Sequence, residues 1–195
     1  DNVSVAFVAK KAFSDDGEET VLCLTFGEDT TLADVSNRIS GQVRQARGEK
    51  AQSVDKLLDT FARMPRFMLR FMMCILRALN FYGRLPASLT RMDPNHCTVF
   101  ISNMGSIKAG APYHHLNDFG TNSIFVTIGE IRKQPFYDDE GNCQLREVVD
   151  FGITLDERIS DGFYFSQSVK LLKHLLAHPH LLEGPAKEVV NDAVD

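Results

Sequence analysis

Residues 156–183 read DERISDGFYFSQSVKLLKHLLAHPHLLE, and this stretch decides the fold. Directly before it, residues 151–155 (FGITL) form a short run with strand-forming residues. From Gly162 to Ala177 apolar residues recur at helical spacing, so we expect a helix over that range. The apolar positions are Phe163, Phe165, Val169, Leu172, Leu175 and Leu176. A strand that leads through a charged turn into a helix is typical of a mixed α/β domain.

Three strands are expected in the chain that leads to this stretch. Residues 97–103 (CTVFISN), 123–131 (SIFVTIGEI) and 144–156 (QLREVVDFGITLD) are rich in β-branched and aromatic residues. Between the last two, QPFYDDEGN at residues 134–142 is predicted to form a hairpin turn. The loop that follows the first strand contains glycines, MGSIKAGAP, but it matches neither a P-loop nor a dinucleotide fingerprint.

Near the N-terminus, residues 3–9 (VSVAFVA) and 20–26 (TVLCLTF) are predicted to pair as a hairpin around a polar turn. A surface helix is expected next, with Thr30 or Thr31 as its N-cap. Its apolar face would consist of Leu32, Val35, Ile39 and Val43. Because the chain opens directly on a strand-like run, we expect that an N-terminal part of the domain is missing.

The composition limits the classes of protein to consider. With 195 residues, 44% apolar and 24% charged, the whole chain, 1–195, is expected to form a single soluble domain of the cytoplasm. A net charge of −5 makes electrostatic binding to nucleic acid or to an anionic membrane unexpected. The four cysteines are scattered without metal-ligand spacing. They are therefore expected to be reduced and mostly buried thiols, and no metal site is predicted.

Residues 53–84 form an unusual segment that is rich in Phe, Met and Arg, and Pro65 is expected to start its second helix. Four arginines are predicted to share one helical face: Arg66, Arg70, Arg77 and Arg84. Charges interrupt the segment too often for it to span a bilayer. Two interpretations remain open. The helix packs on its own domain or a neighbouring subunit, which the composition favours, or residues 60–82 lie on a membrane surface.

Two of these motifs resemble one known family. TVFISNMG at residues 98–105, and the segment from FGITL at 151–155 through DERISDG to the closing helix, are similar to the dihydrolipoyl acyltransferase catalytic domain of 2-oxo acid dehydrogenase complexes. The resemblance implies the chloramphenicol acetyltransferase-like fold, a two-layer α/β (α+β) domain with a mixed sheet and packed helices. It also implies a homotrimer, active sites between subunits, and acyl-coenzyme A as a substrate. Residues 53–84 have no counterpart in that family and resemble an insertion, and the closest likeness is to standalone variants.

The resemblance also implies roles for individual residues. Ser102 matches a serine that donates a hydrogen bond to the oxyanion of the tetrahedral intermediate. Asp161 matches a structural aspartate that pairs with an arginine in an N-terminal region this chain lacks, and Gly162 would permit the turn into the helix. Glu157 departs from the pattern, because the family motif D-H-R-x-x-D-G has its catalytic histidine there.

Two interpretations of Glu157 are open. A carboxylate can act as a general base, but burial would have to make it more basic before it could accept a thiol proton at neutral pH. The favoured interpretation is a glutamate that forms a salt bridge with Arg158 or Arg132. His114 and His115 fall in the loop that covers the family's active-site channel. The favoured interpretation is that they are ordinary loop histidines with backbone partners, and the alternative is that one of them supplies the missing base or passes a proton through Glu157. Since adjacent residues of an extended chain point to opposite faces, at most one is expected to face the channel.

Three functions therefore remain. The first is an acyl-coenzyme A-dependent acyltransferase with an atypical base. The second is an inactive scaffold or binding pseudoenzyme of the same fold. The third is a membrane-surface acyltransferase that uses residues 60–82 to reach a lipophilic acceptor. This third hypothesis would lose its support if Phe67, Met68, Phe71 and Ile75 contacted the domain's own core.

Overall fold

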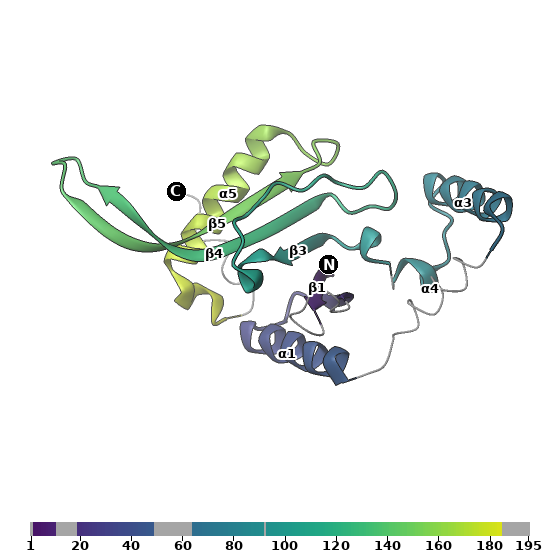
Figure 1. Cartoon of the computed structure of the whole chain (residues 1–195), viewed down its shortest axis with the longest axis horizontal. Coiled ribbons are helices and arrows are strands. Elements are labelled where there is room, and N and C mark those ends of the chain that lie inside the picture. The colour runs from purple at the N-terminus through teal and green to yellow at the C-terminus, as the bar shows by residue number, and fades with distance from the viewer. Residues whose placement is uncertain (1, 11–18, 49–63, 92, 185–195) are drawn as a thin grey trace.

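The computed structural model describes residues 2–10, 19–48, 64–91 and 93–184. Within them a five-stranded mixed sheet forms the body of the molecule, in the order β2-β1-β3-β4-β5 (Figure 1). Its strands are β1 Val3–Lys10, β2 Glu19–Phe26, β3 Val99–Asn103, β4 Ile124–Tyr137 and β5 Cys143–Leu155. The predicted mixed α/β fold is confirmed. The two outer pairs, β1 with β2 and β4 with β5, are antiparallel, whereas β1 with β3 and β3 with β4 are parallel.

Helices cover one face of this sheet, and a long loop covers the other. The helices among the described residues are α1 Leu32–Gly48, α3 Arg66–Phe81, α4 Ala87–Thr90 and α5 Gly162–Ala177. Of these, α1 and α5 lie on the sheet. On one face, α1 packs through Ala46 and Val43 against a small core at Ala9 and Leu22. On the same face, α5 and the sheet together line an apolar cavity of about 700 Å³. The other face carries the loop of residues 104–123, and the candidate site lies there.

The start of α1 follows the predicted capping pattern. The Thr31 hydroxyl accepts from the Asp34 N–H at 3.2 Å, and the Asp34 carboxylate accepts from the Thr31 N–H at 3.2 Å and from the Thr31 hydroxyl at 2.7 Å. These bonds hold the pKa of the exposed Asp34 carboxyl below its usual value. Thr31 is thus the N-cap. The expected apolar face is only partly right, because Leu32 is exposed and Ala46 is buried.

The β4–β5 hairpin is longer than the sequence predicts. β4 continues through Tyr137, so the turn comprises only residues 138–142 rather than 134–142. The Asp138 carboxylate accepts from two backbone N–H groups of the turn, and Gly141 provides a positive φ of 85°. The far half of the hairpin projects beyond the body as an arm (Figure 1). Its exposed large side chains are Ile131, Phe136, Tyr137, Leu145 and Val149.

The structure corrects two expectations about α3. Pro65 immediately precedes the helix, as predicted, but Arg84 lies beyond its end and is not on its face. None of the residues of α3 is buried, so the helix does not pack into the core of its own domain. Residues 53–63 of the predicted insertion lie outside the described part of the chain.

The cysteines also differ from expectation. All four are free thiols, but only Cys97 is buried and Cys23 is half-buried, while Cys74 and Cys143 are exposed.

Candidate active site

Ser102 lies in a cavity of about 230 Å³ on the loop-covered face of the sheet. Strand alternation brings it there, because Phe100 and Ser102 on β3 face the same way as their partners Phe125 and Thr127 on β4. The lining residues are Val8, Pro94, Asn95, Phe100, Ser102, His114, His115, Asn117, Asn122 and Phe125. The Ser102 hydroxyl has a weak contact, 3.6 Å to the Met104 sulfur, so it can turn toward a stronger acceptor.

Both candidate histidines line this cavity, which contradicts the expectation that at most one would. The expectation assumed an extended chain, whereas the loop is irregular at this point and the two rings lie on the same side, 4.7 Å apart. The His114 ring also stacks on Phe125 at 4.1 Å with an interplanar angle of 8°. Phe100 stacks on the same Phe125 at 4.8 Å. An aromatic wall therefore orients His114 beside Ser102.

Backbone contacts determine which ring nitrogen of each histidine is available. His114 Nδ1 lies 2.7 Å from the His115 carbonyl, and His115 Nδ1 lies 3.3 Å from the Leu116 carbonyl. A carbonyl oxygen only accepts, so Nδ1 must carry the hydrogen in both rings. The neutral rings then keep their lone pair on Nε2, the nitrogen that can accept a proton. The shorter bond and the stacking contact hold the His114 ring more firmly than the His115 ring.

Buried groups hold the histidine loop against the sheet. Thr127, which is 2% exposed, directs its hydroxyl to the Pro112 carbonyl at 2.6 Å and to the Gly152 carbonyl at 3.2 Å. Gly152 lies so close to the loop that a Cβ there would be 2.8 Å from the Pro112 oxygen. At the loop's other end Gly120, with a φ of 93°, presses on the Asn95 carbonyl and leaves no room for a side chain. The position of the histidines thus depends on contacts distant in sequence.

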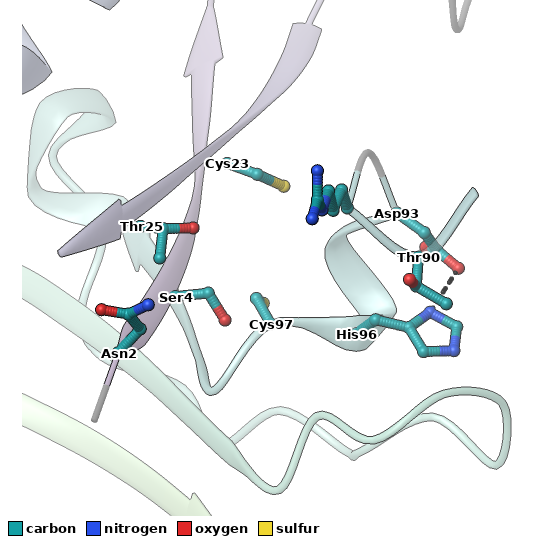
Figure 2. Close-up of a pocket in the computed structure, with 9 residues that line it drawn as sticks. Asn2, Ser4, Cys23, Thr25, Thr90, Asp93, His96 and Cys97 are labelled. Carbon is teal, nitrogen blue, oxygen red and sulfur yellow. Dashed lines mark hydrogen bonds and ion pairs between the residues drawn. The ribbon is translucent and has the colours of Figure 1, made fainter. Parts of the chain in front are cut away.

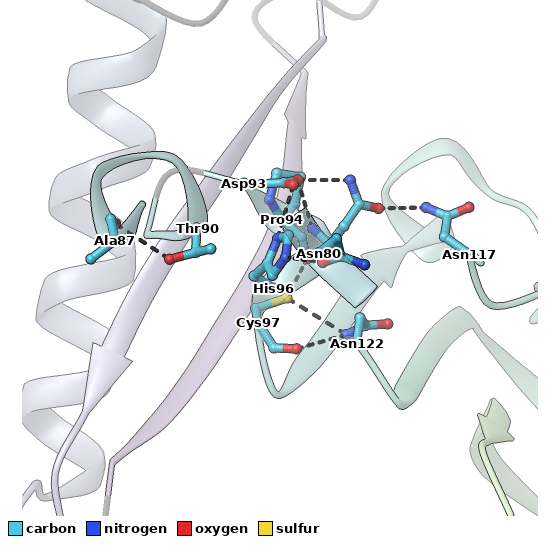
Figure 3. Close-up of polar contacts among 10 residues, drawn as sticks. Asn80, Ala87, Thr90, Asp93, Pro94, His96, Cys97, Asn117 and Asn122 are labelled. Atoms are coloured by element: carbon cyan, nitrogen blue, oxygen red, sulfur yellow. Dashed lines mark hydrogen bonds and ion pairs between the residues drawn. The ribbon is translucent and has the colours of Figure 1, made fainter. Parts of the chain in front are cut away.

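The short segment Asp93–Cys97 is a second anchor for the loop. Figure 3 shows the chain of polar contacts that starts from it. Asn95 donates to Asp93 at 2.7 Å, and Asn117 of the loop donates to Asn95. Asn122 donates to the Cys97 carbonyl at 3.2 Å. In the sequence, Asn95 lies in DPNH and Asn117 lies in YHHLND, and these asparagines were the only local indication of an anchor. The fold is needed to bring the two together.

A larger cavity, of about 520 Å³, lies on the other side of this segment (Figure 2). It contains two thiols, but burial raises the pKa of Cys23 to about 11 and also raises the pKa of Cys97. Both are therefore protonated and poor nucleophiles at neutral pH. Both ring nitrogens of the neighbouring His96 are engaged, Nδ1 with Asp93 at 2.9 Å and Nε2 with Asn80 at 3.0 Å. Despite its size, this cavity offers no activated nucleophile.

Glu157 lies outside the Ser102 cavity, on an exposed turn after β5. The salt bridges expected for it do not form. Arg158 instead binds Asp156 through Nε at 2.8 Å and lowers the pKa of that carboxyl, while Arg132 binds Asp150 at 2.8 Å. Its two predicted partners are therefore occupied, and none of the residues that the structure describes buries Glu157.

The structure shows a capping role for Asp161, and the pairing with an arginine that the resemblance implies stays a prediction. Its carboxylate accepts from the Tyr164 N–H at 2.9 Å and caps α5, which begins at Gly162 as predicted. Gly162 itself is not required for the turn, because it has no positive φ and a Cβ there would meet open space. Asp161 thus fixes the end of the turn that holds Glu157.

Comparison with known proteins gives a consistent result. The family model "2-oxoacid dehydrogenases acyltransferase (catalytic domain)" matches residues 85–183. No curated protein sequence matches the chain.

Among solved structures, dihydrolipoamide acetyltransferase from Azotobacter vinelandii is similar, with 18% identity, a TM-score of 0.54 and coverage of 90% of this chain and 54% of that one. A probable dihydrolipoamide acetyltransferase from Listeria monocytogenes has 14% identity, a TM-score of 0.51 and coverage of 100% and 59%. The cubic core of the pyruvate dehydrogenase multienzyme complex has 17% identity, a TM-score of 0.54 and coverage of 90% and 54%. The chain thus spans little more than half the length of each.

At these identities the solved structures establish the fold alone. The family match covers just over half of the chain and includes both motifs on which the resemblance rested, the strand with Ser102 and the DERISDG turn. That resemblance is confirmed: the chain belongs to the family of 2-oxoacid dehydrogenase acyltransferase catalytic domains.

Proposed function

We propose that this protein is an acyl-coenzyme A-dependent acyltransferase in which His114, rather than the residue at position 157, is the general base. The observation that carries the proposal is the shared cavity of Ser102 and His114. Within it, the His114 Nδ1 contact leaves Nε2 free to accept a proton. Glu157, by contrast, is exposed outside this cavity.

The reaction proceeds in two balanced steps. His114 Nε2 takes the proton from the thiol or hydroxyl of the acceptor as its sulfur or oxygen attacks the thioester carbonyl. The Ser102 hydroxyl donates to the oxyanion that forms. The carbon–sulfur bond to coenzyme A then breaks, and the departing thiolate takes the proton back from the imidazolium. The acyl group ends on the acceptor, and neither oxidation nor reduction occurs.

We further propose a homotrimer whose active sites lie between subunits. The projecting β4–β5 arm supports association, because a two-stranded ribbon with exposed Ile131, Tyr137 and Leu145 is only marginally stable alone. Self-association would also cover the open side of the Ser102 cavity. One of the similar solved structures is the cubic core of a multienzyme complex, the pyruvate dehydrogenase complex.

A second candidate is a scaffold that binds but does not catalyse. In the Azotobacter vinelandii enzyme, the roles of a serine, a histidine and an asparagine in the catalytic mechanism were investigated. The asparagine follows the histidine by four residues. Glu157 and Asp161 have the same spacing here, but a carboxylate replaces the imidazole, and it is exposed in the described part of the chain. If His114 does not act as the base, the fold would retain only its binding surfaces.

The test combines calorimetry with a transfer assay. Acetyl-coenzyme A is titrated into the full chain, and acetyl transfer to dihydrolipoamide is measured in parallel. Wild type is compared with Ser102→Ala and Glu157→His. We expect micromolar binding in all three, and a rate for Ser102→Ala that is about 100–1000-fold lower because an oxyanion donor is lost.

The outcomes separate the two candidates. Binding without transfer in wild type, with transfer gained in Glu157→His, would make the protein a scaffold whose base has been lost at position 157. If a folded trimer neither binds acetyl-coenzyme A nor transfers the acetyl group, the proposed enzyme activity is also excluded. Transfer in wild type that depends on Ser102 supports the proposal.

A further inference from the structure

The exposed face of α3 is not used by the candidate active site, and it is the strongest unexplained feature of the molecule. Figure 1 shows the helix standing apart from the sheet. Phe67 is 75% exposed and Phe71 is 69% exposed, and Met68 and Ile75 are also exposed. Phe67, Phe71 and Ile75 lie one turn apart, and Met68 lies beside them, so the four residues form a continuous stripe along the helix. None of the helix's residues is buried, so the described residues of this chain leave the stripe uncovered.

The charge around this stripe has one sign. Residues 64–91 contain five arginines and no lysine or acidic residue: Arg66, Arg70, Arg77, Arg84 and Arg91. Removing these five from the 21 basic residues of the chain leaves 16 against 26 acidic ones, a net charge of −10. Within the described residues, no carboxylate forms an ion pair with any of the five. The basic charge is thus concentrated on and beside one helix.

The arrangement on the helix is that of an interfacial helix. At 100° per residue, Arg66, Arg70 and Arg77 occupy one narrow sector, and the exposed apolar stripe faces away from it. Sixteen residues extend about 24 Å. None of the described helices is both long and apolar enough to cross a bilayer, so α3 would lie along a surface.

The attachment of α3 suits such a role. The Asn80 side chain contacts His96 at 3.0 Å, which links the last turn to the Asp93–Cys97 segment (Figure 3). The helix ends in two backbone bonds, from Gly83 to Asn80 and from Arg84 to Leu79, with Gly83 at a φ of 63°. One end is therefore held to the body, while the stripe remains free along its length. The family match begins at residue 85, directly after this segment.

We infer that α3 docks on the surface of an anionic lipid membrane, with its apolar stripe among the acyl chains and its arginines near the lipid phosphates. A bilayer surface supplies continuous negative charge over hydrocarbon, which matches both features of the helix. A second copy that docked through the same stripe would cover the apolar residues but would leave the arginines on the outer faces of the helix pair, because they face away from the stripe. This inference does not depend on the chemistry at Ser102.

The experiment uses the full chain and vesicles of phosphatidylcholine, with and without about 30% phosphatidylserine. The chain contains no tryptophan, so Phe71→Trp introduces a single indole reporter on the stripe. Phe163→Trp, at an exposed site on α5, is the matched control. We expect a blue shift of indole emission for Phe71→Trp with anionic vesicles only, and none for Phe163→Trp.

Vesicle sedimentation then measures how much individual side chains contribute to the binding of the protein to vesicles. Arg70→Gln with Arg77→Gln should weaken binding about 25-fold, about fivefold for each charge. Phe67→Ser with Phe71→Ser should weaken it at least about tenfold for each ring. Lys170→Gln with Lys173→Gln removes the same charge from α5 and should leave binding unchanged. Circular dichroism verifies that each variant is folded.

Three results would overturn the inference. One is equal binding to neutral and anionic vesicles, and another is an equal loss in the α5 control. The third is a blue shift of Phe71→Trp without lipid that grows with protein concentration, because it would assign the stripe to a second copy of the chain.

Discussion

Two segments, the loop before β4 and the turn after β5, carry the expected active-site residues other than Ser102, and they are built very differently. The loop of residues 109–122 is held by the buried Thr127 hydroxyl, by close approach of Gly152 and by contacts to Asn95. The turn of residues 156–161 touches the loop's end, where the Asp156 N–H donates to the Ser123 carbonyl at 2.9 Å. Apart from this bond, local contacts hold the turn: the Asp156–Arg158 pair and the Asp161 cap.

This difference suggests where catalytic function resides in this chain. A side chain on the anchored loop keeps one orientation, which a general base requires. The side chain at position 157 is exposed, and no hydrogen bond or ion pair to another described residue sets its orientation. Either the base has moved to the anchored loop, or a neighbouring subunit must order the turn. The predictions below test these alternatives, from the largest expected effect to the smallest.

The largest effect is expected for His114→Gln. Glutamine retains a polar side chain but cannot take a proton, so the acetyl transfer rate should fall by about 100–10,000-fold with little change in acetyl-coenzyme A affinity. His115→Gln is the matched control, since its ring lines the same cavity with a longer 3.3 Å backbone contact, and its rate should fall far less. Equal losses in the two variants would deny His114 a special role.

Thr127→Val tests whether burial anchors the loop. The change preserves shape but leaves the Pro112 carbonyl without its 2.6 Å donor, so the free energy of unfolding should fall by about 1–3 kcal/mol. Urea unfolding at fixed protein concentration measures this. The same change at the exposed Thr25 of β2 is the control and should be nearly neutral. A neutral Thr127→Val would mean that other contacts suffice to hold the loop.

Asp161→Ala tests the local support of the turn. Loss of the cap on Tyr164 should lower the free energy of unfolding by about 1 kcal/mol. Asp161→Asn should be nearly neutral, because asparagine is an equally good N-cap. If asparagine is as harmful as alanine, the charge of Asp161 matters, and the ion pair implied by the family resemblance would replace the cap as its role.

The smallest effect is expected for Glu157→Gln. An exposed side chain with no hydrogen bond or ion pair to the described residues should change the free energy of unfolding by less than about 0.5 kcal/mol. The transfer rate should also be nearly unchanged. A loss as large as that of His114→Gln would return the base to position 157 and require burial of that turn by a neighbouring subunit.

Local signals predicted much of the fold correctly. The limits of α5, the Thr31 cap of α1 and the first hairpin follow from spacing and capping chemistry within a few residues of each other. The incorrect predictions concern features that depend on contacts between residues distant in sequence. β4 extends through Pro135 and Tyr137 because β5 supplies partners for it, and both histidines share a cavity because β4 and Asn95 bend the loop.

By itself, the sequence determined the family, through the strand with Ser102 and the DERISDG turn, and it determined that Glu157 stands where the family has histidine. Only the tertiary structure decided which groups meet. Ser102 and His114 converge because β3 and β4 pair in register and an aromatic stack holds the ring. Only the structure left α3 uncovered, since amphipathic spacing gives a helix an apolar face but does not determine what covers it.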